Sequence, residues 1–188
     1  MADFAVALLA GGRARRFPGK LEHPIGDRPM LVHVYERVRE CGWPIYLLAP
    51  ESFERELAAR LDAPLILDRN PGEGPLHAFV DACAAIGAEA IFAIAADQPR
   101  LEAEVLRTIA RQWRPGDEAI VPEHDGAIEP LAALYSRRAT LREAAALSGK
   151  GAMRELVGRL ATRFVQCDGA YFHNINRAED LAALESAS

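Results

Sequence analysis

A glycine-rich loop that carries four cations stands close to the start of the chain. The stretch "LLAGGRARRFPGK" covers residues 8–20 and places Gly11 and Gly12 directly after an apolar run. Its cations stand out in a chain of net charge -5 and are Arg13, Arg15, Arg16 and Lys20. Glycines let backbone N–H groups approach oxygen atoms closely, and four cations neutralise three or four negative charges. The loop therefore predicts a phosphate site, and a triphosphate matches its charge.

Two common phosphate loops are excluded by spacing. Gly12 and Gly19 have six residues between them instead of four, and Leu21 stands where a P-loop needs Ser or Thr. The adjacent pair Gly11 and Gly12 also lacks the G-x-G spacing of a dinucleotide loop. The alternative interpretation is a plain turn followed by solvated arginines.

A single carboxylate follows the apolar segment 90–96. Asp97 lies in "AADQPRL", and a buried charge at such a position is costly unless it is paired or bound to a metal. Mg²⁺ is typically bound by one or two carboxylates together with substrate phosphates. Asp97 is therefore a candidate magnesium ligand, and the alternative is that it caps the following helix.

The segment "LDRNPGEGPLHAF", residues 67–79, predicts a rigid turn that leads into a helix. Gly72, Gly74 and Pro75 make this turn, so that backbone atoms can approach a flat ligand. Asp68 is a candidate to hydrogen-bond a base or ribose, although a salt bridge to Arg69 explains it equally well.

Short apolar runs that alternate with helical patterns must position these residues. The runs 4–10, 45–49, 65–67 and 90–96 have the uninterrupted apolar character of strands buried on both faces. Helical patterns follow at 29–41, 52–61, 76–86 and 102–113. This alternation predicts an α/β fold with parallel strands and helices on both faces. In such sheets ligands bind at the carboxyl ends of the strands, where the candidate residues stand.

The second half of the sequence is less regular. Residues 118–136 contain two strand-like pieces joined at Asp125-Gly126, which predicts an antiparallel excursion. Helices are expected at 137–147 and 152–160, with a break between them at Gly149-Lys150-Gly151, and a last strand is expected at 163–167. Asn176 and Glu179 have the spacing of a helix N-cap and its partner, so a final helix is expected.

Length and composition restrict the class of protein. We expect one domain over residues 1–188, because single cores are common up to roughly 250 residues. The net charge of -5 disfavours nucleic acid and anionic membranes as partners, and no segment has the length of a membrane span. Three scattered cysteines predict reduced thiols in the cytoplasm, and the five histidines are interpreted as structural or solvated: Cys41, Cys83, Cys167, His23, His33, His77, His124 and His173.

Taken together, these stretches resemble the molybdenum cofactor guanylyltransferases, the MobA-like branch of the nucleotidyltransferases. The loop, "GEGPL" and "AADQP" resemble that family's nucleotide loop, base-contacting turn and metal-binding strand end. "IEPLAALY", "GKGAMRELV" and "HNINRAEDL" resemble its later blocks in the same order. The resemblance implies a three-layer, Rossmann-like fold, and transfer of GMP from GTP to the phosphate of molybdopterin with Mg²⁺ and release of pyrophosphate.

The resemblance also implies a role for particular residues. Its nucleotide-binding positions are Leu9, Ala10, Gly11, Gly12, Arg16, Lys20, Asp68, Gly74, Pro75 and Asp97. Among them Arg16, Lys20 and Asp97 are implied as catalytic, and Asp97 as the metal ligand. Acceptor-side positions are Glu129, Asn174 and Asn176. In this interpretation both asparagines lie toward the acceptor and one of them also touches the metal. Asn176 as a helix cap and Glu129 as a surface charge are equal alternatives.

Two departures from the family pattern leave the substrates open. Ala14 and Gly19 replace the serine and the acidic residue that the family usually carries in its loop. A cytidylyltransferase, or an enzyme acting on another phosphorylated small molecule, therefore remains an alternative. A non-catalytic nucleotide-binding adaptor in molybdoenzyme assembly is the alternative from a different class. Transient contact with molybdoenzyme maturation proteins is compatible with each of these functions.

Overall fold

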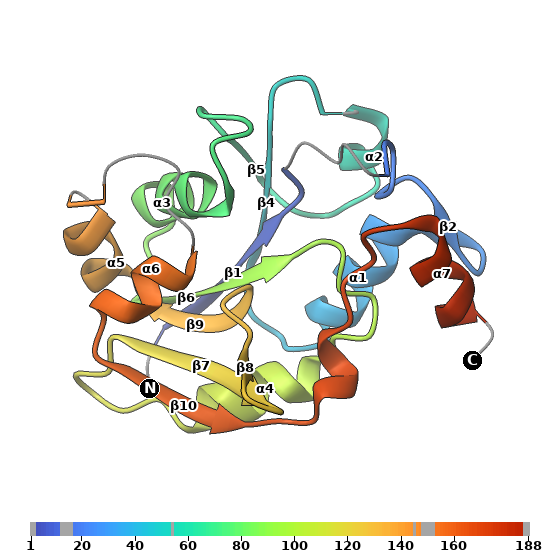
Figure 1. The fold of residues 1–188 in the computed structure, drawn as a ribbon. Coiled ribbons are helices and arrows are strands. Elements are labelled where there is room, and N and C mark those ends of the chain that lie inside the picture. The colour runs from blue at the N-terminus through green and yellow to red at the C-terminus, as the bar shows by residue number, and fades with distance from the viewer. Residues whose placement is uncertain (1–2, 12–16, 54, 145, 148–152, 186–188) are drawn as a thin grey trace.

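The structure is a computed structural model, and it describes residues 3–11, 17–53, 55–144, 146–147 and 153–185. Within these ranges the elements in chain order are β1 Phe4–Leu9, β2 Pro24–Ile25, β3 Arg28–Pro29, α1 Met30–Arg39, β4 Ile45–Ala49, α2 Arg55–Ala59, β5 Leu65–Leu67, α3 Pro75–Ala85, β6 Ala90–Ala95, α4 Ala103–Arg111, β7 Ala119–His124, β8 Ala127–Ile128, β9 Ala132–Ser136, α5 Arg137–Ala144, α6 Met153–Arg159, β10 Thr162–Gln166, the 3₁₀ helix η1 Gly169–Phe172 and α7 Ala178–Glu185. Figure 1 shows a central sheet with helices on both of its faces.

One sheet forms the middle layer, with the strand order β10-β7-β9-β6-β1-β4-β5 and with β8 paired to β7. β1 is parallel to both of its neighbours, β4 and β6, and β5 continues in parallel beyond β4. β9 runs antiparallel between β6 and β7, and β10 is parallel to β7. The expected α/β fold with a mostly parallel sheet is therefore confirmed.

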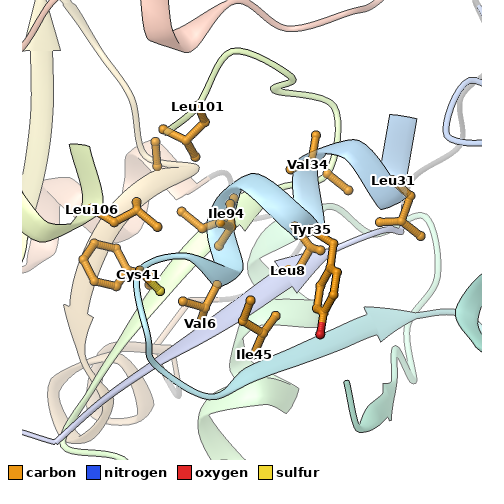
Figure 2. Packing of buried hydrophobic residues seen from close by; sticks show 14 of the residues in the cluster. Val6, Leu8, Leu31, Val34, Tyr35, Cys41, Ile45, Ile94, Leu101 and Leu106 are labelled. Carbon is orange, nitrogen blue, oxygen red and sulfur yellow. The ribbon is translucent and has the colours of Figure 1, made fainter. Parts of the chain in front are cut away.

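The apolar runs form strands because both faces of the sheet are covered. Along β1, Val6 and Leu8 pack into the cluster that includes α1 and α4, whereas Ala7 and Leu9 pack into the cluster that includes α3 and α6. Figure 2 shows part of the first cluster, where side chains of α1 lie over β1 and β4. Burial on both faces explains why these strands lack polar alternation.

The antiparallel excursion in the second half is also present. β7 and β8 pair with Glu123 opposite Ile128, and Asp125 and Gly126 between them have φ values of 47° and 77°. Both are left-handed values, which suits a tight two-residue turn. β9 then returns beside β6, with Ile94 opposite Ala132.

The structure corrects one local expectation, adds one element and leaves one expectation untested. The helix expected over 52–61 is shortened to Arg55–Ala59, where Leu57 is the one buried residue within α2. A small hairpin of β2 and β3, which the apolar pattern does not signal, precedes α1. The predicted break at Gly149-Lys150-Gly151 lies outside the described residues.

Candidate active site

The carboxyl ends of the parallel strands meet at one edge of the sheet. β6 and β4 are each parallel to β1, and β5 is parallel to β4, so the residues that follow β1, β5 and β6 lie along the same edge. These residues are Gly11 after β1, Asp68 after β5 and Asp97 after β6. β7 also ends at this edge, because it is antiparallel to β9, which is itself antiparallel to β6. The fold thus gathers candidate residues that are far apart in the sequence.

Lys20 and Asp97 form an ion pair at this edge. The Lys20 ammonium contacts a carboxylate oxygen of Asp97, and the two side chains are 17% and 18% exposed. Lys20 Nζ also donates a hydrogen bond to the carbonyl oxygen of Ile175 at 3.3 Å. Both charged groups are thus mostly shielded from bulk water but remain partly accessible, which strengthens their interaction with a ligand charge.

The backbone that carries Asp97 is bonded to two other elements. The N–H of Ala96 donates to the carbonyl of Leu9 at 3.1 Å, and the N–H of Ile175 donates to the carbonyl of Asp97 at 2.9 Å. Ile175 is 2% exposed, so this bond is buried. Asn174 and Asn176 flank Ile175 and are exposed, so both residues stand beside Asp97 in the fold.

Asp68 lies against the start of the glycine loop. Its side chain is buried, and Oδ1 accepts a hydrogen bond from the N–H of Asn70 at 2.9 Å. A Cβ added to Gly11 would stand 3.2 Å from Asp68 Oδ2, so the carboxylate is close to the Gly11 backbone. Among the described residues no ion pair joins Asp68 to Arg69, and the N–H of Arg69 donates to Asp81 instead.

The predicted turn before α3 has the expected glycine-dependent geometry. Gly74 has φ 107° and ψ 167°, and Pro75 is the first residue of α3. An L side chain rarely adopts this conformation, so glycine is needed there. Leu9 and Ala10 are buried within the sheet edge, where the N–H of Ala10 donates to the carbonyl of Leu48 at 2.8 Å. Gly12 and Arg16, which the resemblance also implies, lie outside the described residues.

The other side of the edge contains a histidine and carboxylate pair that sequence reasoning missed. His124 Nε2 lies 3.0 Å from Glu129 Oε1, and the His124 ring stacks on Phe172 with a centroid distance of 5.5 Å. Glu129 is 17% exposed, so it is mostly buried rather than a surface charge. A Cβ on Gly169 would stand 2.6 Å from His124 Nδ1, so η1 packs tightly against the ring. The distance in sequence between residues 124 and 169 explains why no motif signalled this contact.

The helix cap at Asn176 differs from the expectation. α7 begins at Ala178, and the Asp180 carboxylate accepts the N–H groups of Asn176 and Arg177 at 2.8 and 2.9 Å. Both bonds lower the pKa of the Asp180 carboxyl, and the bond from the Asn176 N–H has the larger effect. The acidic capping residue is therefore Asp180 and not Glu179.

The donor set at Asp97 fits magnesium. In the described ranges no group of three or more His, Cys, Asp or Glu side chains is arranged to hold a metal ion. A structural zinc site, which needs four protein ligands, is thus absent from that part of the chain. Mg²⁺ instead keeps several waters and uses one or two carboxylates plus substrate phosphates. A lone accessible carboxylate next to a lysine matches this second pattern.

Comparison with known proteins decides the family. The pattern of the MobA-like NTP transferase domain matches residues 6–164 of this chain. The chain belongs to the MobA-like NTP transferase family. The expectation of a nucleotidyltransferase related to the molybdenum cofactor guanylyltransferases is thus confirmed.

Individual relatives agree with this family. The molybdenum cofactor guanylyltransferase of Desulfosudis oleivorans is 28% identical over 191 residues, which cover 96% of this chain and 93% of the relative. The crystal structure of molybdopterin-guanine dinucleotide biosynthesis protein A from Archaeoglobus fulgidus superposes with a TM-score of 0.80 at 25% identity, covering 97% of each chain.

More distant structures share the fold alone. A CMP:2-keto-3-deoxy-manno-octonic acid synthetase in complex with CTP superposes with a TM-score of 0.78 at 14% identity, over 99% of this chain and 98% of the other. The same MobA-like architecture is therefore found in proteins of low sequence identity. No helix in the described ranges is both long enough and apolar enough to cross a membrane.

Proposed function

We propose that this MobA-like protein transfers GMP from GTP to the terminal phosphate of molybdopterin, releases pyrophosphate and requires Mg²⁺. The observation that carries this proposal is the meeting of Lys20 and Asp97 at the carboxyl edge of the sheet, in a chain of this family. An ammonium group can bind the phosphates of a nucleotide while a neighbouring carboxylate binds the cation that accompanies them. The Desulfosudis oleivorans relative, which carries the name of this activity, supports the choice of substrates.

The nucleotide is proposed to lie between the glycine loop and the turn before α3. Leu9 to Gly12 hold the nucleotide, and Arg16 and Lys20 bind its phosphates. Asp68 and the Gly74-Pro75 turn face the ribose and base. The position of Asp68 against Gly11 supports this assignment, because one ligand can then contact the loop and the carboxylate together.

Asp97 is proposed to hold Mg²⁺, which neutralises phosphate charge when it is bound. An oxygen of the acceptor phosphate forms the new bond to the α-phosphorus, and the bond from the α-phosphorus to the leaving pyrophosphate breaks. Lys20 and Arg16 stabilise the charge that develops on the pyrophosphate. The acceptor phosphate is already ionised at neutral pH, so none of the residues proposed here has to act as a general base.

Glu129, Asn174 and Asn176 are proposed to face the acceptor. The hydrogen bond between the Ile175 N–H and Asp97 supports this, because it holds both asparagines next to the proposed metal ligand. The bond from His124 to Glu129 restrains the Glu129 carboxylate in a partly accessible position. A substrate with hydrogen-bond donors, as a pterin has, suits such an acceptor-rich surface.

We further propose that residues 1–188 form one domain and act in the cytoplasm. A single sheet that joins β10 to β5 supports the first point, and three cysteines without disulfides support the second. Transient contact with molybdoenzyme maturation proteins is compatible with this location.

The decisive experiment identifies the product. Purified protein is incubated with Mg²⁺, molybdopterin and each of the four nucleoside triphosphates, and the products are measured by mass spectrometry and pyrophosphate release. A guanine dinucleotide formed from GTP is the expected product. A cytosine dinucleotide from CTP would instead favour the related cytidylyltransferase. Nucleotide binding without pyrophosphate release in any mixture would favour the non-catalytic adaptor.

A further inference from the structure

The segment between β6 and α4, residues 96–102, is irregular and carries Asp97. Its backbone carbonyl groups accept hydrogen bonds from donors in several parts of the chain. The carbonyl of Asp97 accepts the N–H of Ile175 at 2.9 Å, and that of Gln98 accepts the N–H of Leu101 at 3.1 Å. Irregular backbone depends on such bonds for its conformation, because it has no repeating ladder of its own.

α1 provides two further donors to the same segment. His33 Nε2 lies 3.1 Å from the carbonyl oxygen of Pro99, and Arg37 Nε donates to the carbonyl of Leu101 at 3.3 Å. Arg37 Nη2 also donates to Glu102 Oε1 at 2.7 Å. His33 and Arg37 are four residues apart, so they lie on one face of the helix. That face therefore holds the segment at two of its carbonyl groups.

The protonation state of His33 follows from its partner. A carbonyl oxygen can only accept, so Nε2 of His33 carries the hydrogen. Burial lowers the pKa of His33 from its ordinary value, which favours the neutral ring with the proton on Nε2. Pro99 has no N–H group of its own, so local backbone bonds can hold this residue only through its carbonyl.

We propose that His33 is a positioning residue for Asp97, which it holds at the carboxyl edge of the sheet through its hydrogen bond to the Pro99 carbonyl. This inference rests on the proposed role of Asp97 as the magnesium ligand. Pro99 is two residues from Asp97, so displacement of its carbonyl tilts the preceding peptide groups and moves the carboxylate. A misplacement of about 1 Å costs roughly 100-fold in rate when geometry is demanding.

The side chain of Gln98 strengthens the need for such a restraint. Gln98 is 1% exposed, and neither polar atom of its amide has a protein hydrogen-bond partner in the described ranges. An amide that is buried in this way loses its hydrogen bonds to water without replacement, which destabilises the segment. The segment therefore needs compensating bonds, and the donors of α1 provide two of them.

The test compares two substitutions that differ in the donor alone. In His33→Gln the terminal amide reaches about as far as Nε2 and can donate to Pro99, whereas His33→Met fills a similar volume without a donor. We expect His33→Met to lower kcat about 10- to 100-fold, to leave the KM for GTP within about 2-fold and to raise the Mg²⁺ concentration needed for half-maximal rate. His33→Gln should retain kcat within about 3-fold.

Two outcomes would overturn the proposal. One is a kcat for His33→Met that equals that of the wild type, and the other is an equal loss in both variants, which would indicate a packing role. Should His33→Met fail to give a cooperative melting transition, His33→Asn replaces it, because its shorter amide cannot reach Pro99.

A binding measurement separates this proposal from the proposed function. Mn²⁺ binding in the presence of GTP is followed by electron paramagnetic resonance, which needs no turnover. Weaker Mn²⁺ binding in His33→Met than in His33→Gln supports positioning by His33 even if the acceptor is misidentified. Equal Mn²⁺ binding by the wild type and both variants would reject it, whatever reaction the enzyme catalyses.

Discussion

The two sides of the carboxyl edge are built differently. On the proposed nucleotide side, defined by Gly11, Asp68 and the Gly74-Pro75 turn, the backbone sets the geometry. On the proposed acceptor side, defined by His124, Glu129 and η1, side chains from distant segments set it by contacting one another. The first kind of site can be recognised in a short local motif, whereas the second requires the fold.

Lys20 and Asp97 connect the two sides, so their loss is expected to have the largest effect. In Asp97→Asn the shape is kept but the charge that would bind Mg²⁺ is removed. We expect kcat to fall by about 10²–10³-fold, as for other lost transition-state electrostatics. Pyrophosphate release at saturating GTP and Mg²⁺ measures this loss.

The control for Asp97→Asn is Asp62→Asn, which removes an exposed carboxylate away from the edge. It should leave kcat unchanged. A cooperative melting transition in both variants shows that each is folded. Turnover of Asp97→Asn within 3-fold of the wild type would remove Asp97 from the proposed mechanism.

The tight packing of the acceptor side predicts the next largest effect. In Gly169→Ala the new Cβ would stand 2.6 Å from His124 Nδ1, so either η1 or the His124 ring must move. Such overpacking costs about 1–3 kcal/mol, which lowers Tm by about 2–4 °C for each kcal/mol in a chain of this size. Thermal melting measures the cost.

The matched control is Gly158→Ala in α6. A Cβ at Gly158 meets nothing within 4 Å, so stability should stay constant or rise by up to about 1 kcal/mol. Gly169→Ala should therefore lower Tm, whereas Gly158→Ala should leave it unchanged or raise it. A Gly169→Ala variant as stable as Gly158→Ala would mean that the acceptor side is loosely packed.

The backbone geometry of the nucleotide side is probed by Gly74→Ala. At φ 107° and ψ 167° an L side chain is strained, so we expect a loss of about 1–3 kcal/mol in the free energy of unfolding and a higher KM for GTP. Gly87→Ala, just beyond the other end of α3, is the control, because it meets open space. Urea unfolding and initial rates provide both values. If the KM of Gly74→Ala equals that of Gly87→Ala, the turn does not contact the nucleotide.

These differences explain which parts of the molecule the sequence predicts. The strand expected at 4–10 occurs as Phe4–Leu9 and the one at 90–96 as Ala90–Ala95. Both could be predicted because an unbroken apolar run is typical of a strand that is buried on both faces. The turn at Gly74 follows from glycine and proline chemistry at adjacent positions. Local rules are sufficient in these places.

Contacts between distant segments account for what the sequence did not predict. The partners of Lys20 include the carbonyl of Ile175, which lies 155 residues away, and the bond from His33 to Pro99 spans 66 residues. No local pattern encodes such pairs. The capping residue Asp180 was missed for a different reason: two acidic residues stand side by side after Asn176, and spacing alone favoured the first.

Side-chain bonds between distant residues also connect the start of β7 to α5 and to the start of β10, at the opposite ends of the strands from the carboxyl edge. A substitution here is expected to have the smallest effect. Before β7, Glu118 accepts the N–H of Ala161 at 2.9 Å and pairs with Arg142 at 2.9 Å. The hydrogen bond from the Ala161 N–H is the largest cause that lowers the pKa of the Glu118 carboxyl below its ordinary 4.5, and the Arg142 side chain lowers it further.

A carboxyl group whose pKa is lower in the folded state stabilises the protein above its unfolded pKa, and this contribution is lost as pH falls through the folded pKa. Glu118→Gln should therefore reduce the free energy of unfolding at pH 7 by less than about 1 kcal/mol, because the pair is partly exposed. The gap between wild type and variant should close as pH falls below about 4.5. Urea unfolding at pH 7 and pH 3.5 tests this, with the exposed Glu56→Gln as the control. A gap of equal size at both pH values would show that Glu118 acts through shape and not through its charge.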